Sequence, residues 1–173
     1  MSDATPRRIV LLRHAKADWA QESDHERPLS DRGRKDAPVA GQWLAWKGFL
    51  PELTLCSTAQ RTRETWKLVA HELPQRPKTV YEERLYEASL GELLALINET
   101  SDEVADLMLV GHNPGMHALA DALTGRAEGD LAARMNRSAF PTCAIAVITF
   151  DGSWKSVEHG VGTLADYWVP HKA

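Results

Sequence analysis

The chain has little of several features that would place it in a special class. It has only two cysteines, Cys56 and Cys143, far apart and each within an apolar run. That spacing is typical of neither a zinc site nor a redox pair, so we expect two thiols buried in the core. No apolar run approaches the roughly 18 residues that a membrane-spanning helix needs. The N-terminus also lacks the apolar segment of a secretory signal, which favours a cytoplasmic protein.

The chain also lacks an excess of basic over acidic residues. The formal net charge is −4, whereas a broad surface for nucleic acid or an anionic membrane needs many cations. We therefore expect neither as a partner, although a small basic pocket remains compatible with this charge. With 173 residues, 43% of them hydrophobic and 25% charged, the chain is long enough to bury a core. There is no repeat, low-complexity tract or linker, so we expect one domain over residues 1–173.

Short apolar runs alternate with helical patterns along the whole chain. Strands are predicted at 8–14, 53–58, 78–85, 106–112, 143–150 and 153–160, the last as an edge strand because it alternates more. Helices are predicted at 30–48, 59–73, 89–99 and 113–125. This order predicts an α/β fold with a largely parallel central sheet flanked by helices. Residues 20–29 and 125–142 are predicted as loops that shape a site entrance, and whether the second covers the site stays open.

The first predicted helix has clear end signals, with Ser30 as N-cap and Gly48 after its last turn. Val39, Trp43 and Trp46 fall at helical spacing, so we expect both tryptophans in the core. Trp19 has two interpretations: it stacks on a substrate, or it is a core or loop-anchoring residue. We favour the second interpretation.

Ionisable residues follow the ends of four predicted strands. Arg13 and His14 end the first, Arg61 follows the second, Glu87 follows the third and His112 ends the fourth. In open α/β sheets this edge binds ligands, because loops and helix N-termini converge there. Scattered surface charges would not follow the strand ends so consistently.

Two arginines and two histidines at one edge indicate phosphoryl chemistry. The guanidinium group of arginine presents a planar fork that fits phosphoryl oxygens. Histidine near neutral pH is able to act as nucleophile, base or hydrogen-bond donor. Arg13, Arg61 and His112 would neutralise the phosphoryl group while His14 attacks phosphorus. This mechanism needs no metal or other cofactor, and the sequence has no carboxylate cluster suited to magnesium.

The segments "LLRHAKADW", "STAQRTRET" and "LVGHNPG" resemble the three motifs of the histidine phosphatase superfamily. In its small size and in the segments "RPLSDRGRKDA" and "LYEAS", the chain resembles the short phosphohistidine phosphatases of this superfamily, the SixA-like group. The resemblance implies a phosphoglycerate mutase-like fold, with His14 as the residue that becomes phosphorylated and Arg13, Arg61 and His112 as the rest of the phosphate pocket. Lys16 stands where the mutases have glutamate, which disfavours mutase activity.

Four further residues are candidates with a weaker basis. Lys16, Asp18 and Asn113 lie beside the motifs and are predicted to contact substrate. Glu87 is either an acid that protonates a leaving group, as in many superfamily members, or a surface carboxylate before a helix. An imidazole leaves phosphorus more readily than an alkoxide, so a phosphohistidine phosphatase needs a strong acid less.

These observations predict a metal-independent phosphatase that works through a phosphohistidine intermediate. The favoured substrate is phosphohistidine on a protein, because the insertions that cover small substrates in larger members are missing. Two alternatives stay open: a phosphatase of small esters, such as sugar or nucleotide phosphates, and a phosphate-binding module without turnover.

Overall fold

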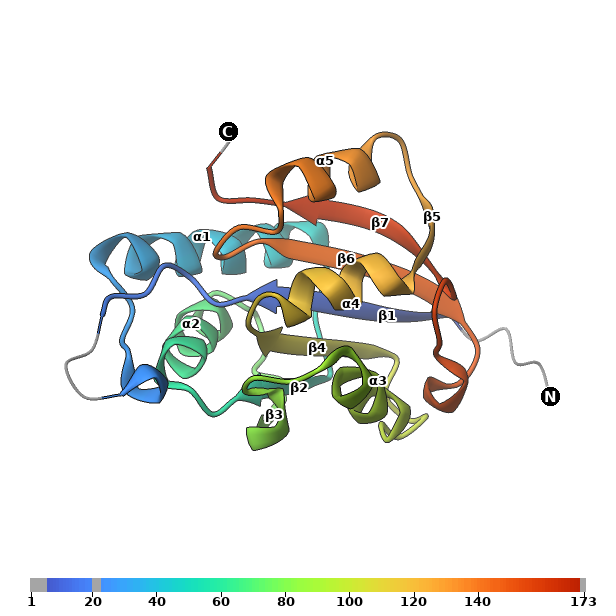
Figure 1. The fold of residues 1–173 in the computed structure, drawn as a ribbon, viewed down its shortest axis with the longest axis horizontal. Helices are drawn as coiled ribbons and strands as arrows, with labels where there is room; N and C mark the ends of the chain where they lie inside the picture. Colours follow the sequence, from blue (N-terminus) through green and yellow to red (C-terminus); the bar gives the residue numbers. More distant parts are fainter. Residues whose placement is uncertain (1–5, 20–22, 172–173) are drawn as a thin grey trace.

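The computed structural model describes residues 6–19 and 23–171, which form a mixed sheet with helices on both faces (Figure 1). The strands are β1 Pro6–Arg13, β2 Leu53–Ser57, β3 Lys78–Glu82, β4 Asp106–Gly111, β5 Thr124–Ala127, β6 Ile145–Asp151 and β7 Gly162–Trp168. The helices are α1 Asp31–Lys47, α2 Gln60–His71, α3 Leu90–Asn98, α4 Gly115–Leu123 and α5 Leu131–Ser138. The predicted α/β fold is confirmed.

The strand order in the sheet is β3-β2-β4-β1-β6-β7-β5. Strands β1, β2, β3 and β4 run parallel to one another, so their carboxyl ends share one edge. Strand β6 pairs antiparallel with both β1 and β7, which makes the other half of the sheet mixed. The parallel half thus places the ends of β1, β2 and β4 side by side.

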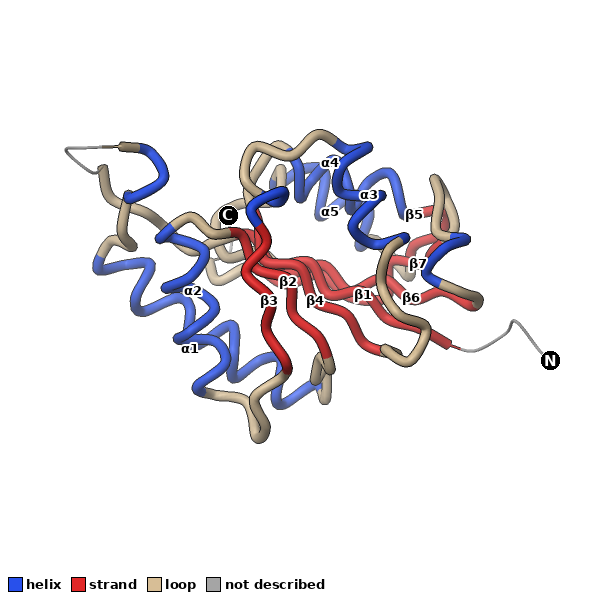
Figure 2. The backbone as a smooth tube through the Cα atoms, turned by 90° about the horizontal axis from the view of Figure 1, so that it is seen from below, coloured by secondary structure: helices blue, strands red, loops and turns tan. Residues whose placement is uncertain are grey.

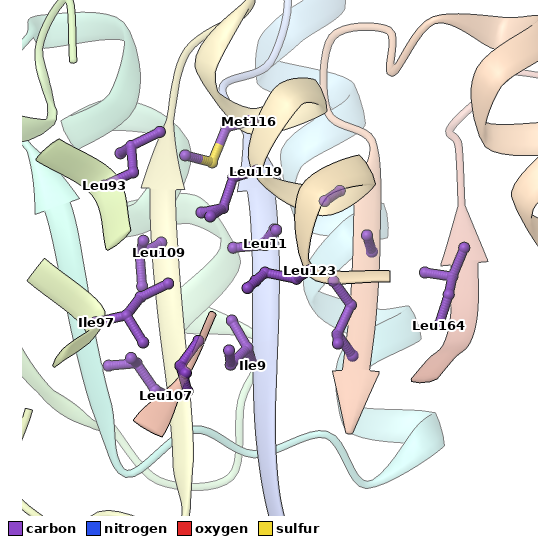
Figure 3. Close-up of a cluster of buried hydrophobic side chains, with 14 of the residues drawn as sticks. Ile9, Leu11, Leu93, Ile97, Leu107, Leu109, Met116, Leu119, Leu123 and Leu164 are labelled. Atoms are coloured by element: carbon purple, nitrogen blue, oxygen red, sulfur yellow. The ribbon is translucent and has the colours of Figure 1, made fainter. Parts of the chain in front are cut away.

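Both faces of the sheet are buried, and this explains why the strands are almost continuously apolar. Helices α1 and α2 cover one face, and α3, α4 and α5 cover the other (Figure 2). Ile9 and Leu11 of β1 face the α3–α4 side, where the cluster in Figure 3 lies. Val10 and Leu12 face the α1–α2 side, as alternate strand residues must.

Helix α1 corrects one expectation. Ser30 is its N-cap, accepting a hydrogen bond from Gly33 N, and Gly48 ends it at φ +74°, as predicted. However, Trp46 is 78% exposed, so its expected place in the core was wrong, whereas Trp43 is partly buried against the cluster on the α1–α2 side. Val39 on the same helix is 46% exposed. The buried face of α1 consists mostly of small residues: Gly33, Asp36, Ala37, Ala40, Gly41 and Leu44. A Cβ at Gly41 would lie 2.6 Å from the carbonyl oxygen of Val69 in α2, so close helix packing turns the large side chains outward.

Two predictions for the C-terminal third were also wrong. Residues 153–160 form no edge strand but include a short 3₁₀ turn, Trp154–Ser156. Trp154 and Val157 are buried three residues apart, which is the spacing of a turn and not the two-residue alternation of a strand. The stretch 125–142 contains part of β5 and all of α5 instead of one loop, and β7 follows at Gly162.

Two other expectations concern the cysteines and the membrane. Cys56 and Cys143 are buried free thiols, as predicted. Among the described helices, none has the length and apolar character needed to cross a membrane.

Candidate active site

The turn after β1 is fixed by neighbouring elements. His14 N donates to the Gly111 carbonyl oxygen of β4 at 3.1 Å, and Cys143 N donates to the His14 carbonyl oxygen at 2.9 Å. Ala15 N donates to Thr65 Oγ1 of α2 at 2.9 Å. The turn is therefore bonded on three sides, which sets the direction of the His14 side chain.

The His14 ring is buried and neutral. Its Nδ1 lies 2.7 Å from the Ala15 carbonyl oxygen, and because a carbonyl only accepts, Nδ1 carries the proton. Burial, with smaller contributions from nearby His112 and the two arginines, lowers the pKa of His14 to about 3. At neutral pH, Nε2 therefore has a free lone pair and is suited to nucleophilic attack.

The second predicted histidine, His112, follows β4 and lies beside the first. The ring centroids of His14 and His112 are 5.3 Å apart. His112 Nε2 is 2.8 Å from Ser57 Oγ at the end of β2, while Nδ1 is buried with no hydrogen-bond partner among the described residues. Burial, and then the charge of Arg61, lowers the pKa of His112 to about 3. When Ser57 donates to Nε2, the Nδ1–H of the neutral ring is left as a donor.

The predicted arginines bring two positive charges to these neutral rings. Arg13 donates through Nη1 to the Phe140 carbonyl oxygen at 3.2 Å. Burial lowers the pKa of Arg13, and the positive charge of Arg61 adds to that effect. The two guanidinium groups are close enough to repel, so an anion between them would relieve the repulsion. Arg61 stands on the first turn of α2, whose N-terminus also favours negative charge.

Asp24 belongs to this network although sequence reasoning did not select it. Its backbone carbonyl oxygen accepts from Arg61 Nη1 at 2.7 Å, and its Oδ2 accepts from Arg61 Nη2 at 3.0 Å. Oδ2 also accepts from the Tyr86 hydroxyl at 2.5 Å. The Tyr86 hydrogen bond is the largest of several effects that lower the pKa of the Asp24 carboxyl well below its usual range. The ionised carboxylate therefore balances part of the positive charge.

The four predicted pocket residues share one cavity of about 260 Å³, which we call the His14 cavity. Its walls include Arg13, His14, Lys16, Arg27, Arg61, His112 and Asn113. Arg27 was also missed by sequence reasoning. The pattern that holds it, "RPL", resembled the family but gave no role for the arginine.

The three weaker candidates differ in their placement. Lys16 is exposed and lines the His14 cavity. Asn113 lines it too, but its amide is engaged: Nδ2 donates to the Phe140 carbonyl oxygen at 2.8 Å, and Oδ1 accepts from His117 N at 3.1 Å. Asp18 is exposed and is not on the cavity wall. Its backbone instead bonds the 27–28 segment, through Pro28 and Arg27.

Glu87 lies in a neighbouring cavity of about 390 Å³, which we call the Tyr86 cavity. Arg61, His112 and Asn113 line both cavities and so form the wall they share. The Glu87 side chain is exposed. The backbone of Glu87 adopts φ +56°, which turns the chain from the 3₁₀ turn Glu83–Leu85 toward α3. The structure thus puts this carboxylate near the site but outside the His14 cavity.

A metal centre would need a different arrangement. Across 6–19 and 23–171, no three His, Cys, Asp or Glu side chains gather as a metal site requires. The chemistry that the arranged groups themselves can perform is binding an anion between Arg13 and Arg61, with a neutral imidazole at its side.

Comparison with known proteins agrees with this geometry. Residues 9–135 match the family model described as histidine phosphatase superfamily (branch 1). The chain belongs to the histidine phosphatase superfamily. An uncharacterized protein of Mycobacterium tuberculosis (strain H37Rv) is 39% identical over 161 residues, covering 92% of this chain and 99% of the relative.

Solved structures show the same fold. A protein from Agrobacterium tumefaciens, provisionally named phosphohistidine phosphatase SixA, superposes with a TM-score of 0.81 at 35% identity, covering 95% of this chain and 99% of that one. The protein histidine phosphatase SixA complexed with tungstate gives a TM-score of 0.75 at 24% identity, covering 94% and 97%. At that lower identity the likeness concerns the fold alone.

Proposed function

We propose that this protein is a phosphatase that transfers the phosphoryl group of its substrate to His14 and then to water. The observation that carries the proposal is the Nδ1 contact of His14 with the Ala15 carbonyl oxygen at 2.7 Å. It leaves Nε2 unprotonated beside Arg13 and Arg61 in the His14 cavity. Arginine forks on either side of a phosphoryl group would neutralise the charge on its equatorial oxygens.

The reaction has two displacements. In the first, the Nε2 lone pair of His14 attacks phosphorus, the bond from phosphorus to the leaving group breaks, and the leaving atom takes a proton from water. In the second, water attacks the phosphoryl-imidazole, the P–Nε2 bond breaks, and orthophosphate and neutral His14 are formed. His112 Nδ1–H is the candidate donor to a phosphoryl oxygen, because it is buried with no other partner in the described residues. No step requires a metal.

We propose phosphohistidine on a protein as the substrate. An imidazole is a good leaving group once protonated, so the reaction does not depend on a strong acid inside the His14 cavity. Glu87 lies in the neighbouring Tyr86 cavity, exposed to water. The similarity to the Agrobacterium tumefaciens protein, at 35% identity over most of both chains, also supports this substrate. The expected cytoplasmic location stays a prediction.

The Tyr86 cavity favours one alternative, a small phosphate ester. It joins the His14 cavity at Arg61 and His112, measures about 390 Å³ and carries Glu87 on its wall. A small alcohol held there would place its oxygen near a carboxyl group able to protonate it. A binding module without turnover is the remaining alternative, and a turnover assay separates it from both enzymes.

Phosphorus NMR tests the proposal directly. The protein is mixed with a phosphohistidine peptide, phosphoramidate and several sugar and nucleotide phosphates, with His14→Ala and His117→Ala in parallel. His117 lies close by, stacked on Phe140, but is not on the wall of the His14 cavity. We expect orthophosphate release from the P–N compounds, unchanged in His117→Ala and at least a thousandfold slower in His14→Ala.

Three results would change this conclusion. Release mainly from an ester, reduced by Glu87→Gln, would favour the small-ester phosphatase. Tight vanadate binding with no turnover of any compound would favour the binding module. Equal rates in His14→Ala and the wild type would remove His14 as the nucleophile, and the proposed mechanism with it.

A further inference from the structure

A larger groove, of about 780 Å³, lies beside the site between α2 and β3. We call it the α2–β3 groove. The wall residues used below are His25, Thr58, Arg63, Lys67, Arg76 and Tyr81. Its α2 wall runs from Gln60 to Ala70, which is about 15 Å at 1.5 Å per residue. That length accommodates roughly four or five residues of an extended peptide.

The groove begins next to the candidate catalytic residues. His25 Nε2 lies 3.0 Å from Thr58 Oγ1 at one end of the groove. The His25 ring contacts Tyr86 edge-on at 5.0 Å between centroids, and Tyr86 contacts His112 in the same way at 5.5 Å. Two ring contacts therefore separate the groove from the His14 cavity. A peptide with its phosphorylated residue in that cavity would have neighbouring residues within reach of the groove.

The groove is more basic than the protein as a whole. Arg63, Lys67 and Arg76 line it in a chain of net charge −4. Within the described ranges, Lys67 and Arg76 form no ion pair, and the Arg63 guanidinium lies 5.0 Å from the Tyr81 ring centre. None of the ion pairs in the described residues has to be broken at Arg63, Lys67 or Arg76 when an anionic ligand approaches.

Two carboxylates, Glu26 and Glu64, also line the groove. Glu64 already accepts hydrogen bonds from Leu29 N at 3.0 Å and from Gln60 Nε2 at 2.6 Å. Its charge is thus partly used within the protein, and the three cations outnumber the two carboxylates. The balance favours an acidic occupant.

The other wall of the groove is an edge strand. Strand β3 stands at the end of the sheet order, beside β2 (Figure 2). Tyr81 on β3 is 47% exposed and lines the groove. An edge strand next to a groove is a common place for an extended segment to lie.

We propose that the α2–β3 groove binds an acidic, extended segment next to the phosphorylated residue of the protein substrate. This proposal rests on the proposed function, because it assigns a recognition surface to the same reaction. It explains how a site that handles only a phosphoryl group would select one protein over another: the His14 cavity binds the phosphoryl group, and Arg63, Lys67 and Arg76 read the flanking charge.

The test uses two fluorescent peptides of equal length that carry phosphoryltriazolylalanine, a non-hydrolysable mimic of phosphohistidine. One has glutamates on both sides of the mimic and the other has serines. Dissociation constants from fluorescence anisotropy are compared for wild type, Lys67→Glu and Arg76→Glu. Lys78→Glu is the control, since Lys78 is exposed on β3 but adjacent to Thr79, so it points to the opposite face.

We expect the wild type to bind the acidic peptide about tenfold more tightly than the serine peptide at low salt. The preference should vanish near 1 M salt, where charges are screened within about 3 Å. Lys67→Glu and Arg76→Glu should each remove most of the preference. Lys78→Glu, which changes the net charge equally, should retain it. Phosphoramidate turnover should be the same in all four proteins, since this substrate has no flanking residues.

Each other outcome overturns a defined part of the reasoning. The groove proposal is overturned if the two peptides bind with equal affinity, or if Lys78→Glu loses the preference for the acidic peptide as fully as Lys67→Glu and Arg76→Glu do. In either case, turnover of phosphoramidate would still support the phosphatase proposal. Absence of both peptide binding and turnover in the wild type overturns the proposed function, and the groove proposal with it. If a single-stranded oligonucleotide binds as tightly as the acidic peptide, the groove recognises any polyanion and not an acidic peptide segment. This result also overturns the groove proposal.

Discussion

Lowering the pH should destabilise the folded protein because His14 is buried as a neutral ring. Its pKa is lowered from 6.5 to about 3 by burial. In the unfolded chain the ring has its ordinary pKa of about 6.5. Between these two values the unfolded chain binds a proton that the folded protein does not. The contribution of His14 to the free energy of unfolding is therefore fully present above pH 6.5, and it is lost progressively as the pH drops toward 3.

The size of the effect at pH 5 depends little on the exact folded value. An ordinary imidazole is about 3% neutral at pH 5, whereas His14 stays almost fully neutral. The difference in proton binding lowers the free energy of unfolding by about 2 kcal/mol between pH 8 and pH 5. His112, whose pKa is also lowered to about 3, adds a loss of similar size for the same reason.

Urea denaturation at pH 8.0 and 5.0 measures this loss. We compare wild type with His14→Gln, which removes the titrating group, and with His71→Gln, which changes an exposed histidine of α2. The loss should shrink by about 2 kcal/mol in His14→Gln and stay as in wild type in His71→Gln. Imidazole NMR of the folded protein should show His14 as the Nδ1–H tautomer from pH 8 to 5. A His14 ring that titrates near pH 6.5, or a pH dependence untouched by His14→Gln, would refute the reasoning.

Two further predictions concern a hydrogen bond beside the site and the burial of two tryptophans. Hydrogen bonding to Asp24 is the main cause that raises the pKa of Tyr86 to about 12; Asp24→Asn should lower it toward the usual value of about 10, and an unchanged ultraviolet titration of Tyr86 would contradict this. Trp19 is 85% exposed and Trp154 fully buried. Trp19→Ala should therefore change the free energy of unfolding by less than about 0.5 kcal/mol, and Trp154→Ala should lower it by about 3–5 kcal/mol. If urea denaturation gives similar losses of unfolding free energy for Trp19→Ala and Trp154→Ala, the difference in burial does not determine how much each tryptophan stabilises the protein.

Trp19 shows how local sequence can mislead about burial. The favoured interpretation was a core or loop-anchoring residue, and the core half of it was wrong, since the Trp19 side chain is 85% exposed. The backbone around it is nevertheless held, with Ala17 bridged to Leu29 and Asp18 N donating to Pro28 at 2.8 Å. The Arg27 guanidinium lies 4.2 Å from the indole centre. An indole at a fixed position in a short loop has no periodicity that would reveal which way it points.

The sequence by itself determined the α/β class, the strands β1 to β4 and β6, and the placement of Arg13, His14, Arg61 and His112 at one edge of the sheet. It could do so because apolar periodicity is local, and because parallel strands must end at the same edge. The end signals at Ser30 and Gly48 were equally local. For these features, the residues near a position decide its structure.

Only the tertiary structure decided the partners of the site and the burial of the large side chains. Asp24 reaches Arg61, 37 positions away, and Arg27 enters the same cavity from a loop; neither contact follows from a local pattern. Trp46 was turned outward because Gly41 packs against α2, a contact that the spacing of α1 alone does not encode. Proximity between distant segments depends on how the elements pack, so the chemistry at each strand end was predictable while its neighbours were not.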